Sequence, residues 1–413
     1  MIRSRHVFYL GGYDPIDAAA QYRRFSGQLK IFTRTWDVAT ELGELETPGA
    51  TSCARWRISS STSHWEVDTV FDVMLWDDLV RKDLSRPFFT RILKGSMHYF
   101  DFIVSGASQR YFAANWRYGF YYLYPMLLSA VLAGCAGFIG CKLAAWSGLA
   151  GFRAVVVEFP LGILMFVGLL RLVGERLRIL SLLDLWSFTH DYIRGSRPDL
   201  EERLDQFANL LIEHARGRTA EEIIIVGHSL GAMLAVDVVS RALGLDPDFA
   251  SVGTSVCVLT VGATIPKVVL HQKAGQRRGA IAVVAAEAAI AWWEIHSIED
   301  CISFYKFHPV ELRRIDREWS RSKPHIRKFP LRRMLRPATY NRYRFHFLRL
   351  HYQIVMANDA RSKYDFFLAL CGPIEFVRWI IATGGLLDFV APDGTWRLAD
   401  DEPFPAQQPQ GVA

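Results

Sequence analysis

Hydrophobic and polar positions in the first quarter of the chain follow an alternation of strand-like and helix-like segments. Apolar runs rich in β-branched and aromatic residues predict strands at residues 6–10, 29–35, 54–59 and 67–75. A helix is expected at 18–29, after a turn containing Gly11, Gly12 and Pro15. Residues 76–81 are expected to form a loop, in which the neighbouring acids Asp77 and Asp78 are structural.

The same alternation returns after residue 198. It predicts an amphipathic helix at 199–216, a buried strand at 222–226, a helix at 231–243, a strand at 255–261, an alanine-rich helix at 280–291 and a strand at 292–295. Strands that alternate with helices form a mostly parallel sheet with helices on both faces. The predicted fold class is therefore α/β.

Two long apolar runs interrupt this pattern. Residues 120–145 contain one charged residue, Lys142, and residues 154–173 contain Glu158 and Arg171 near their ends. Each is about as long as the ~20 apolar residues that cross a bilayer as a helix. We expect a transmembrane hairpin over residues 118–180. The alternatives are two buried core helices or a hairpin that dips into one leaflet.

Arginines flank the two runs on their outer sides. Arg110 and Arg117 precede the first run, and Arg171, Arg176 and Arg178 accompany or follow the second. Positive residues favour the cytoplasmic side of a membrane. The sequence thus predicts a multi-pass membrane protein with two spans. Its cytoplasmic domain would be built from residues 1–117 and 181–399, followed by a disordered tail at 400–413.

Composition narrows the function classes without choosing one. The 413 residues are 51% hydrophobic and 22% charged, which excludes a disordered chain. The net charge of +6 is compatible with nucleic acid, an anionic membrane or an acidic substrate, but no nucleic-acid-binding motif occurs. The six cysteines include no CxxC pair, so neither a disulfide framework nor a zinc site is indicated. No secretory signal, metal or organic cofactor is expected.

A basic segment covers residues 313–349. Pro324, Pro330 and Pro337 argue against one long helix there. The segment could clamp an anionic substrate, rest on the cytoplasmic leaflet or form a solvated face. Resting on the leaflet is favoured, since each basic residue near an anionic surface contributes roughly 1 kcal/mol.

The strongest chemical signal is Gly227-His228-Ser229-Leu230-Gly231. An apolar strand precedes it and a helix follows, which is the setting of a nucleophile elbow. The tight turn demands small neighbours and holds the Ser229 hydroxyl at the carboxyl edge of the sheet. The sequence predicts Ser229 as a nucleophile, with a structural strand–helix turn as the alternative. His228 is expected to have a packing role.

The motif and its setting resemble the lipase and esterase branch of the α/β-hydrolase superfamily. This resemblance covers most of the chain outside the two apolar runs. It implies an acid after a later strand and a histidine near the C-terminus, in the order Ser, Asp, His. The position of the hairpin before the elbow strand departs from the usual family plan and leaves the lid and the substrate open.

Later segments supply candidates for both roles. Asp300, in the loop after the strand at 292–295, is the preferred acid, and Glu299 is the fallback. Residues 343–353 are expected to form a final strand that leaves into a loop. His351 at its end is the preferred base; His346 is second and His308 third.

The oxyanion hole needs two backbone N–H groups. The resemblance implies Leu230, directly after the nucleophile, as one donor. The other would be Gly12 or Tyr13 in the turn after the first strand, which resembles the family's His-Gly turn with Gly11 in place of the histidine.

The expected function is hydrolysis of acyl esters by a Ser-His-Asp triad. The membrane anchor suggests a lipid or other amphipathic substrate. A non-catalytic membrane scaffold and an acyltransferase with the same serine are the rival interpretations, and the oligomeric state stays open.

Overall fold

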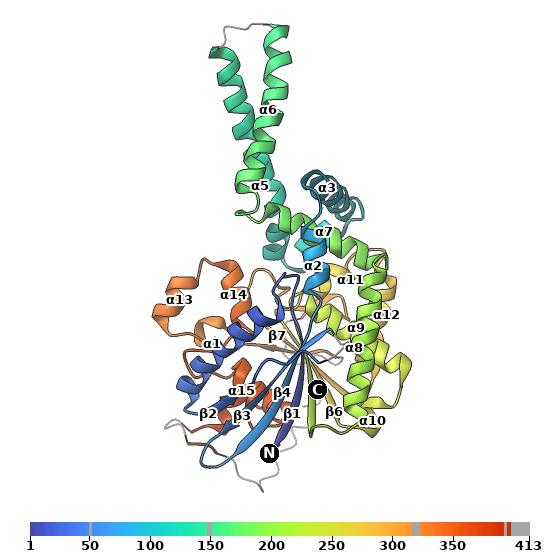
Figure 1. The fold of residues 1–413 in the computed structure, drawn as a ribbon, viewed down its shortest axis with the longest axis vertical. Helices are drawn as coiled ribbons and strands as arrows, with labels where there is room; N and C mark the ends of the chain where they lie inside the picture. The colour runs from blue at the N-terminus through green and yellow to red at the C-terminus, as the bar shows by residue number, and fades with distance from the viewer. Residues whose placement is uncertain (49–51, 147–150, 316–322, 392–394, 398–413) are drawn as a thin grey trace, which may run out of the picture.

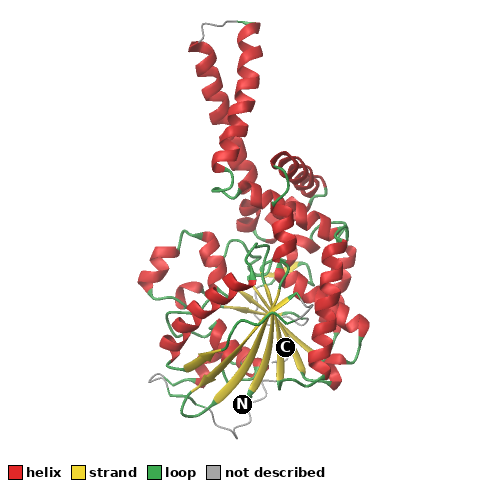
Figure 2. Cartoon of the chain, viewed as in Figure 1, coloured by secondary structure: helices red, strands yellow, loops and turns green. Residues whose placement is uncertain are grey.

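Eight strands of the described chain form one mixed, mostly parallel sheet (Figures 1 and 2). The computed structural model describes residues 1–48, 52–146, 151–315, 323–391 and 395–397. In sheet order β10-β7-β6-β5-β1-β4-β3-β2, only β3 runs against the others. The strands are β1 (Ser4–Leu10), β2 (Ala39–Leu42), β3 (Cys53–Ser61), β4 (Glu66–Met74), β5 (Glu222–His228), β6 (Ser255–Val261), β7 (Ile290–His296) and β10 (His325–Lys328). A separate two-stranded ribbon joins β8 (Phe307–His308) to β9 (Arg313–Arg314).

Alternate residues of the central strands enter two separate apolar cores. Phe8 and Leu10 of β1 lie in one core, whereas Val7 and Tyr9 lie in the other. Successive side chains of a strand point to opposite faces of the sheet, so both faces must be covered.

Helices cover both faces, as the sequence predicts (Figure 1). One face carries α1 (Ala18–Trp36), α14 (Phe347–Gln353), α15 (Phe366–Cys371) and α16 (Phe376–Ile381), with α13 (Pro337–Tyr343) beside α14. The other carries α8 (Pro198–Arg216), α9 (Gly231–Leu245), α10 (Phe249–Val252), α11 (Ile265–Val269) and α12 (Gly275–Ala286). Short 3-10 helices span Leu331–Arg333 and Gly385–Phe389.

A further helical layer covers the carboxyl edge of the sheet. It consists of α2 (Asp77–Leu84), α3 (Phe88–Val104), α4 (Ala107–Ala114) and α7 (Ile179–Ile193). Between α4 and α7 the chain forms α5 (Trp116–Trp146) and α6 (Phe152–Val173), which pack against each other and project away from the sheet (Figure 1). Both are long and apolar enough to cross a membrane. Only 11% and 6% of their most apolar windows are buried, so they are not core helices of the α/β body.

Three local predictions were wrong. Residues 29–35 belong to α1 because Phe25, Leu29, Phe32 and Trp36 repeat at helical spacing and are buried together. Residues 77–81 begin α2, whose first turn carries two acids that favour a helix N-terminus. The region of residues 343–353 is helical at α14 and contains no strand.

One further helix is shorter than predicted, and two predicted segments lie at least partly outside the described residues. The alanine-rich helix ends at Ala286, and β7 already begins at Ile290. The tail from residue 400 and residues 316–322 of the basic segment lie outside the described residues.

The first strand is fixed by a buried ion pair. The Arg5 side chain is fully buried, and its Nε donates to Glu222 Oε2 of β5 at 2.8 Å. Its two terminal nitrogens donate to the carbonyl oxygens of Gly372 and Ile374 at 2.9 and 2.7 Å. The guanidinium thereby joins the centre of the sheet to the C-terminal helices.

We predict that Arg5→Ala destabilises the fold by about 3–5 kcal/mol, because it leaves the Glu222 carboxylate buried and unpaired. Urea unfolding of the detergent-purified protein measures the change. Arg216→Ala, which removes an arginine that pairs with Asp246 near the surface, is the control and should leave the midpoint nearly unchanged. Equal small shifts in both variants would contradict the role assigned to Arg5.

Candidate active site

Ser229 lies in a strained turn between β5 and α9. All seven residues of β5 are buried, and α9 begins two residues after the serine. Ser229 has φ of +57°, a region that non-glycine residues rarely adopt and that often marks functional sites. Its N–H donates to the Val261 carbonyl and its carbonyl accepts from the Thr264 N–H, both at 3.2 Å. These two bonds to the end of β6 hold the turn in place.

Glycine is required on both sides of this turn. A Cβ on Gly227 would collide with Cα of Ala232, and a Cβ on Gly231 would collide with the carbonyl oxygens of Leu10 and Gly11. The small residues predicted from the motif are therefore required by close backbone approach. That approach also presses the first turn of α9 against the end of β1.

Asp300 and His351 form a buried pair. Asp300 Oδ2 accepts from His351 Nδ1 at 2.8 Å, and Oδ1 accepts from the Ile302 N–H at 2.9 Å. Each residue is only 2% exposed. With the Nδ1 proton directed at the carboxylate, Nε2 carries the lone pair that can accept a proton. Nε2 has no hydrogen-bond partner in the described part of the chain.

The alternative acids and bases have other partners or positions. Glu299 Oε2 accepts from the Ser297 hydroxyl and from the Leu331 N–H. His346 is exposed before the first turn of α14, and His308 Nδ1 accepts from the Glu311 N–H in the β8–β9 ribbon. The structure thus brings His351 to Asp300, although from a helix where the sequence predicted a strand end.

Ser229 and His351 line one cavity of about 570 Å³ at the carboxyl edge of the sheet. It lies between the elbow, the β1–α1 turn, α14 and the bases of α5 and α7. Ser229 is half-buried, and its hydroxyl forms no hydrogen bond with His351 Nε2. Hydrogen bonds between such groups are often long or absent without a ligand and tighten when one binds.

The three residues expected in the oxyanion hole meet at the same cavity. Gly12 lies so close to the serine that a Cβ there would be 3.4 Å from Ser229 Oγ. Gly12, Tyr13 and Leu230 line the cavity, and their backbone N–H groups donate to no acceptor among the described residues. The N-terminus of the 15-residue helix α9 adds a favourable dipole for negative charge.

Two contacts hold α14 in position. His228 Nε2 donates to the His351 carbonyl at 3.2 Å. Burial, and then the neighbouring His351, lower the pKa of His228 well below its usual range, so it is a neutral spacer. The Tyr352 hydroxyl donates to Asp14, which ties α14 to the β1–α1 turn that contains Gly12.

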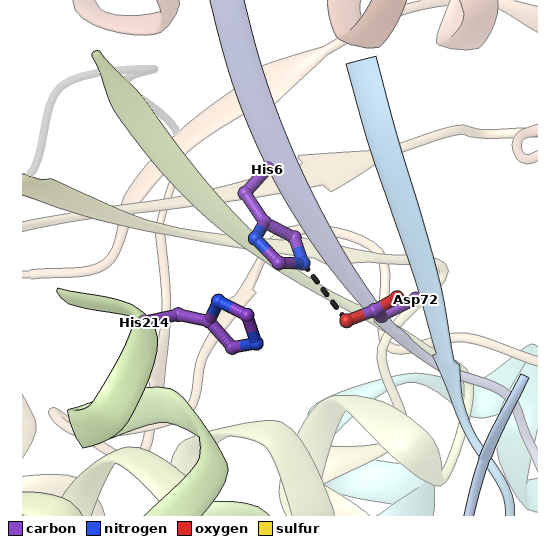
Figure 3. Close-up of side chains that lie close together, drawn as sticks. All are labelled: His6, Asp72 and His214. Carbon is purple, nitrogen blue, oxygen red and sulfur yellow. Dashed lines mark hydrogen bonds and ion pairs between the residues drawn. The ribbon is translucent and has the colours of Figure 1, made fainter. Parts of the chain in front are cut away.

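Two clusters with metal-ligating side chains lie elsewhere. In the first, His6 Nε2 is 2.8 Å from Asp72 Oδ2, with His214 opposite (Figure 3). Arg55 donates to both Asp72 oxygens at 2.7 and 2.6 Å, and its positive charge disfavours a cation there. In the second, His98, His190 and Asp191 meet, but Lys94 Nζ donates to the Asp191 carboxylate at 2.7 Å. Both clusters are arranged as ion-pair networks.

Comparison with known proteins gives no relative. No protein-family model matches the chain, and no curated protein and no solved structure shows significant similarity to it. The likeness to α/β-hydrolases rests on the residues and the geometry described above.

Sequence reasoning missed Lys267 and Tyr352 at the cavity wall. Tyr352 stands directly beside the predicted base. Lys267 is the one charged residue in the apolar run Ile265-Pro-Lys-Val-Val-Leu270, a signal that could have marked it as functional.

We predict that Gly231→Ala abolishes any reactivity of Ser229, because the added methyl group forces α9 away from β1 and opens the turn. Gly244→Ala on the same helix is the matched control, since a Cβ there meets nothing within 4 Å. The control should be neutral or more stable by up to about 1 kcal/mol. Covalent labelling by an active-site serine probe measures the effect, and normal labelling of the Gly231 variant would refute the packing argument.

Proposed function

We propose that this protein is a membrane-anchored serine hydrolase with an α/β-hydrolase fold, and that it cleaves acyl esters. The observation that carries the proposal is the convergence of three features at one cavity. These are a serine at positive φ, a buried histidine–aspartate pair, and backbone donors beside the serine; neither His351 Nε2 nor these donors have a hydrogen-bond partner among the described residues.

The order of elements supports the hydrolase fold. The nucleophile follows β5, the acid follows β7 and the histidine follows β10, three parallel strands of one sheet. Strand β1 neighbours β5 and supplies the turn that leads into α1. This is the chain order Ser, Asp, His, with the oxyanion turn in the position that the fold requires.

In the proposed reaction, His351 Nε2 takes the proton of the Ser229 hydroxyl while Oγ attacks the ester carbonyl carbon. The resulting oxyanion is bound by the N–H of Leu230 and by that of Gly12 or Tyr13. Collapse of the intermediate breaks the ester bond, and the departing alcohol takes the proton from His351. His351 then takes a proton from a water molecule, which attacks the acyl-enzyme and releases the carboxylic acid as Ser229 regains its proton. Asp300 fixes the imidazole tautomer and stabilises the imidazolium.

Labelling with a fluorophosphonate probe tests the activated serine. Wild-type protein should be labelled and Ser229→Ala should not, with at least about a thousandfold loss of esterase activity. Asp300→Asn should lose roughly 10⁴-fold, because the imidazole takes the wrong tautomer. Ser181→Ala is the control, since Ser181 lines the same cavity but its hydroxyl donates to the Arg178 carbonyl at 3.3 Å.

Absence of labelling in folded wild-type protein would overturn the enzyme proposal and favour a non-catalytic scaffold. Labelling without ester hydrolysis in water would point to transfer of the acyl group to another acceptor.

The membrane part of the proposal rests on the exposed surface of α5 and α6. Apart from their contact with each other, most of the apolar surface of these two helices is exposed in the described structure, and in water so large an apolar surface would be unfavourable. Arginines at the outer ends of both helices support a cytoplasmic location of the α/β body.

Helix α3 adds an independent apolar surface beside the hairpin. Phe89, Leu93, Met97, Phe100 and Val104 recur at helical spacing, and each is at least 60% exposed. The opposite face is buried against α7. Figure 1 shows α3 beside the base of the hairpin.

A cation–π contact sets the level of α3 relative to the hairpin. The Arg171 guanidinium, in the last turn of α6, lies 4.7 Å from the ring centre of Phe88 and 5.5 Å from that of Phe89. Because α6 leaves the proposed span at this arginine, α3 begins at the level of the membrane surface. We infer that α3 lies in the interface with its apolar stripe toward the acyl chains.

Two native cysteines offer a test of the membrane location. Cys135 and Cys141 are exposed on α5, whereas Cys53, Cys257 and Cys371 are buried. In membranes, Cys135 and Cys141 should resist a membrane-impermeant maleimide and react only after detergent denaturation. Ser251→Cys, at an exposed position on the α/β body, should react in inverted vesicles and not in intact cells.

Rapid labelling of Cys135 and Cys141 in membranes would show that the hairpin lies in water. Labelling of the Ser251→Cys variant in intact cells would refute the cytoplasmic location alone.

A further inference from the structure

A buried lysine faces the cavity beside the proposed nucleophile. Lys267 lies in α11, three residues after Thr264, whose N–H donates to the Ser229 carbonyl. It lines the same cavity and is only 2% exposed. Its ammonium nitrogen lies 4.3 Å from the ring centre of Trp186. Among the described residues, no carboxylate or other acceptor takes a hydrogen bond from this nitrogen.

The lysine is costly in this position. A buried cation without a counter-charge is unfavourable, and burial lowers the pKa of Lys267 well below its usual range with no acid to oppose the effect. The cation–π contact with Trp186 offsets only part of that cost. The Tyr111 hydroxyl donates to the Lys267 carbonyl at 2.6 Å, which fixes the backbone from which the side chain extends. A leucine or methionine would fill the same space without this cost.

The cavity wall carries further positive charges. Arg176, Arg178 and Arg349 line it, and neither Arg176 nor Arg178 pairs with a carboxylate in the described part of the chain. Among the described residues of the wall the one acid is Asp14, which accepts from the Tyr352 hydroxyl. Arg176 and Arg178 are exposed and therefore lie at the mouth, whereas Lys267 is inside. Such a distribution of charge attracts anions and directs them inward.

We propose that Lys267 binds a phosphate or carboxylate group of the ester substrate, so that the substrate class is an anionic, amphipathic acyl ester. Leu177, Leu182, Leu185 and Ile302 of the same wall provide apolar contact for the acyl chain. The arginines at the mouth guide the anion in, and the negative charge of the bound anion favours the ammonium form of Lys267, which then supplies charge-assisted hydrogen bonds. This inference rests on the proposed hydrolase function and adds its substrate class.

The test compares matched esters in wild-type protein and in Lys267→Met, which keeps the side-chain length without the charge. One pair is the 4-nitrophenyl monoester of glutaric acid and 4-nitrophenyl valerate. The other is a 1-acylglycerol 3-phosphate and the 1-acylglycerol of the same chain. Wild-type protein should prefer the anionic member of at least one pair, and the pair that shows it identifies carboxylate or phosphate as the ligand.

Lys267→Met should reduce kcat/KM for the preferred anionic ester by about 10- to 100-fold, the range expected for a hydrogen bond to a charged group. The neutral ester should change by less than about threefold. Equal losses for both esters, or no preference in wild-type protein, would overturn the proposal.

Two further measurements separate the possible failures. Fluorophosphonate labelling of Lys267→Met should persist, which shows that the site is folded. If wild-type protein is not labelled at all, the result counts against the proposed hydrolase function and not against the role of Lys267 alone. If the variant fails to fold, the proposal is tested by protecting wild-type protein from fluorophosphonate labelling with small ligands. Glycerol 3-phosphate or glutarate should slow the labelling, whereas glycerol should not. Equal labelling rates with all three would overturn the proposal.

Discussion

The first turn of α9 lies directly against the end of β1, so close that no side chain fits at Gly231. This backbone approach is the constraint on which the candidate site depends. It forces Ser229 into positive φ, places the N-terminus of α9 behind the hydroxyl and brings the turn at Gly12 alongside. Strain in such a turn persists only where the surroundings over-determine it. Here the hydrogen bonds from Ser229 to Val261 and Thr264 and the buried strand β5 do so.

Asp300 and His351 come from the C-terminal part of the chain, and side-chain hydrogen bonds hold them in place. Asp300 is fixed by the Ile302 N–H, and His351 is fixed by Asp300 and by His228. The contact between Tyr352 and Asp14 then joins α14 to the β1–α1 turn. A network of this kind makes the position of the His351 imidazole dependent on residues outside the proposed triad.

The cavity lies at the base of the hairpin formed by α5 and α6. Tyr118, Tyr121 and Tyr124 at the base of α5 form part of its wall, as do residues that follow α6. If the hairpin enters a bilayer, the cavity opens close to its surface, where amphipathic esters concentrate. The positively charged wall would then select among those esters by charge, while the apolar residues accept the acyl chain.

The sequence by itself determined the features that depend on local chemistry. Apolar residues at periods of 2 and 3.6 are enough to predict the alternation of strands and helices, and the spacing of the glycines is enough to predict the turn at Ser229. Uninterrupted apolar length is enough to predict the two long helices. Asp300 and His351 were predicted from their order along the chain through a family resemblance.

Tertiary structure decided what depends on packing between distant segments. The pattern at residues 29–35 suits either period, and burial of one face of α1 against β3 and β4 selects the helix. His351 reaches Asp300 from a helix because the contacts of His228 and Tyr352 hold that helix at the sheet edge. The single charge in the apolar run marks Lys267 in the sequence, but only the folded chain shows that it is buried at the cavity without an acceptor among the described residues. Only the folded chain determines which side chains share a cavity, since that depends on the distances between segments that the sequence keeps apart.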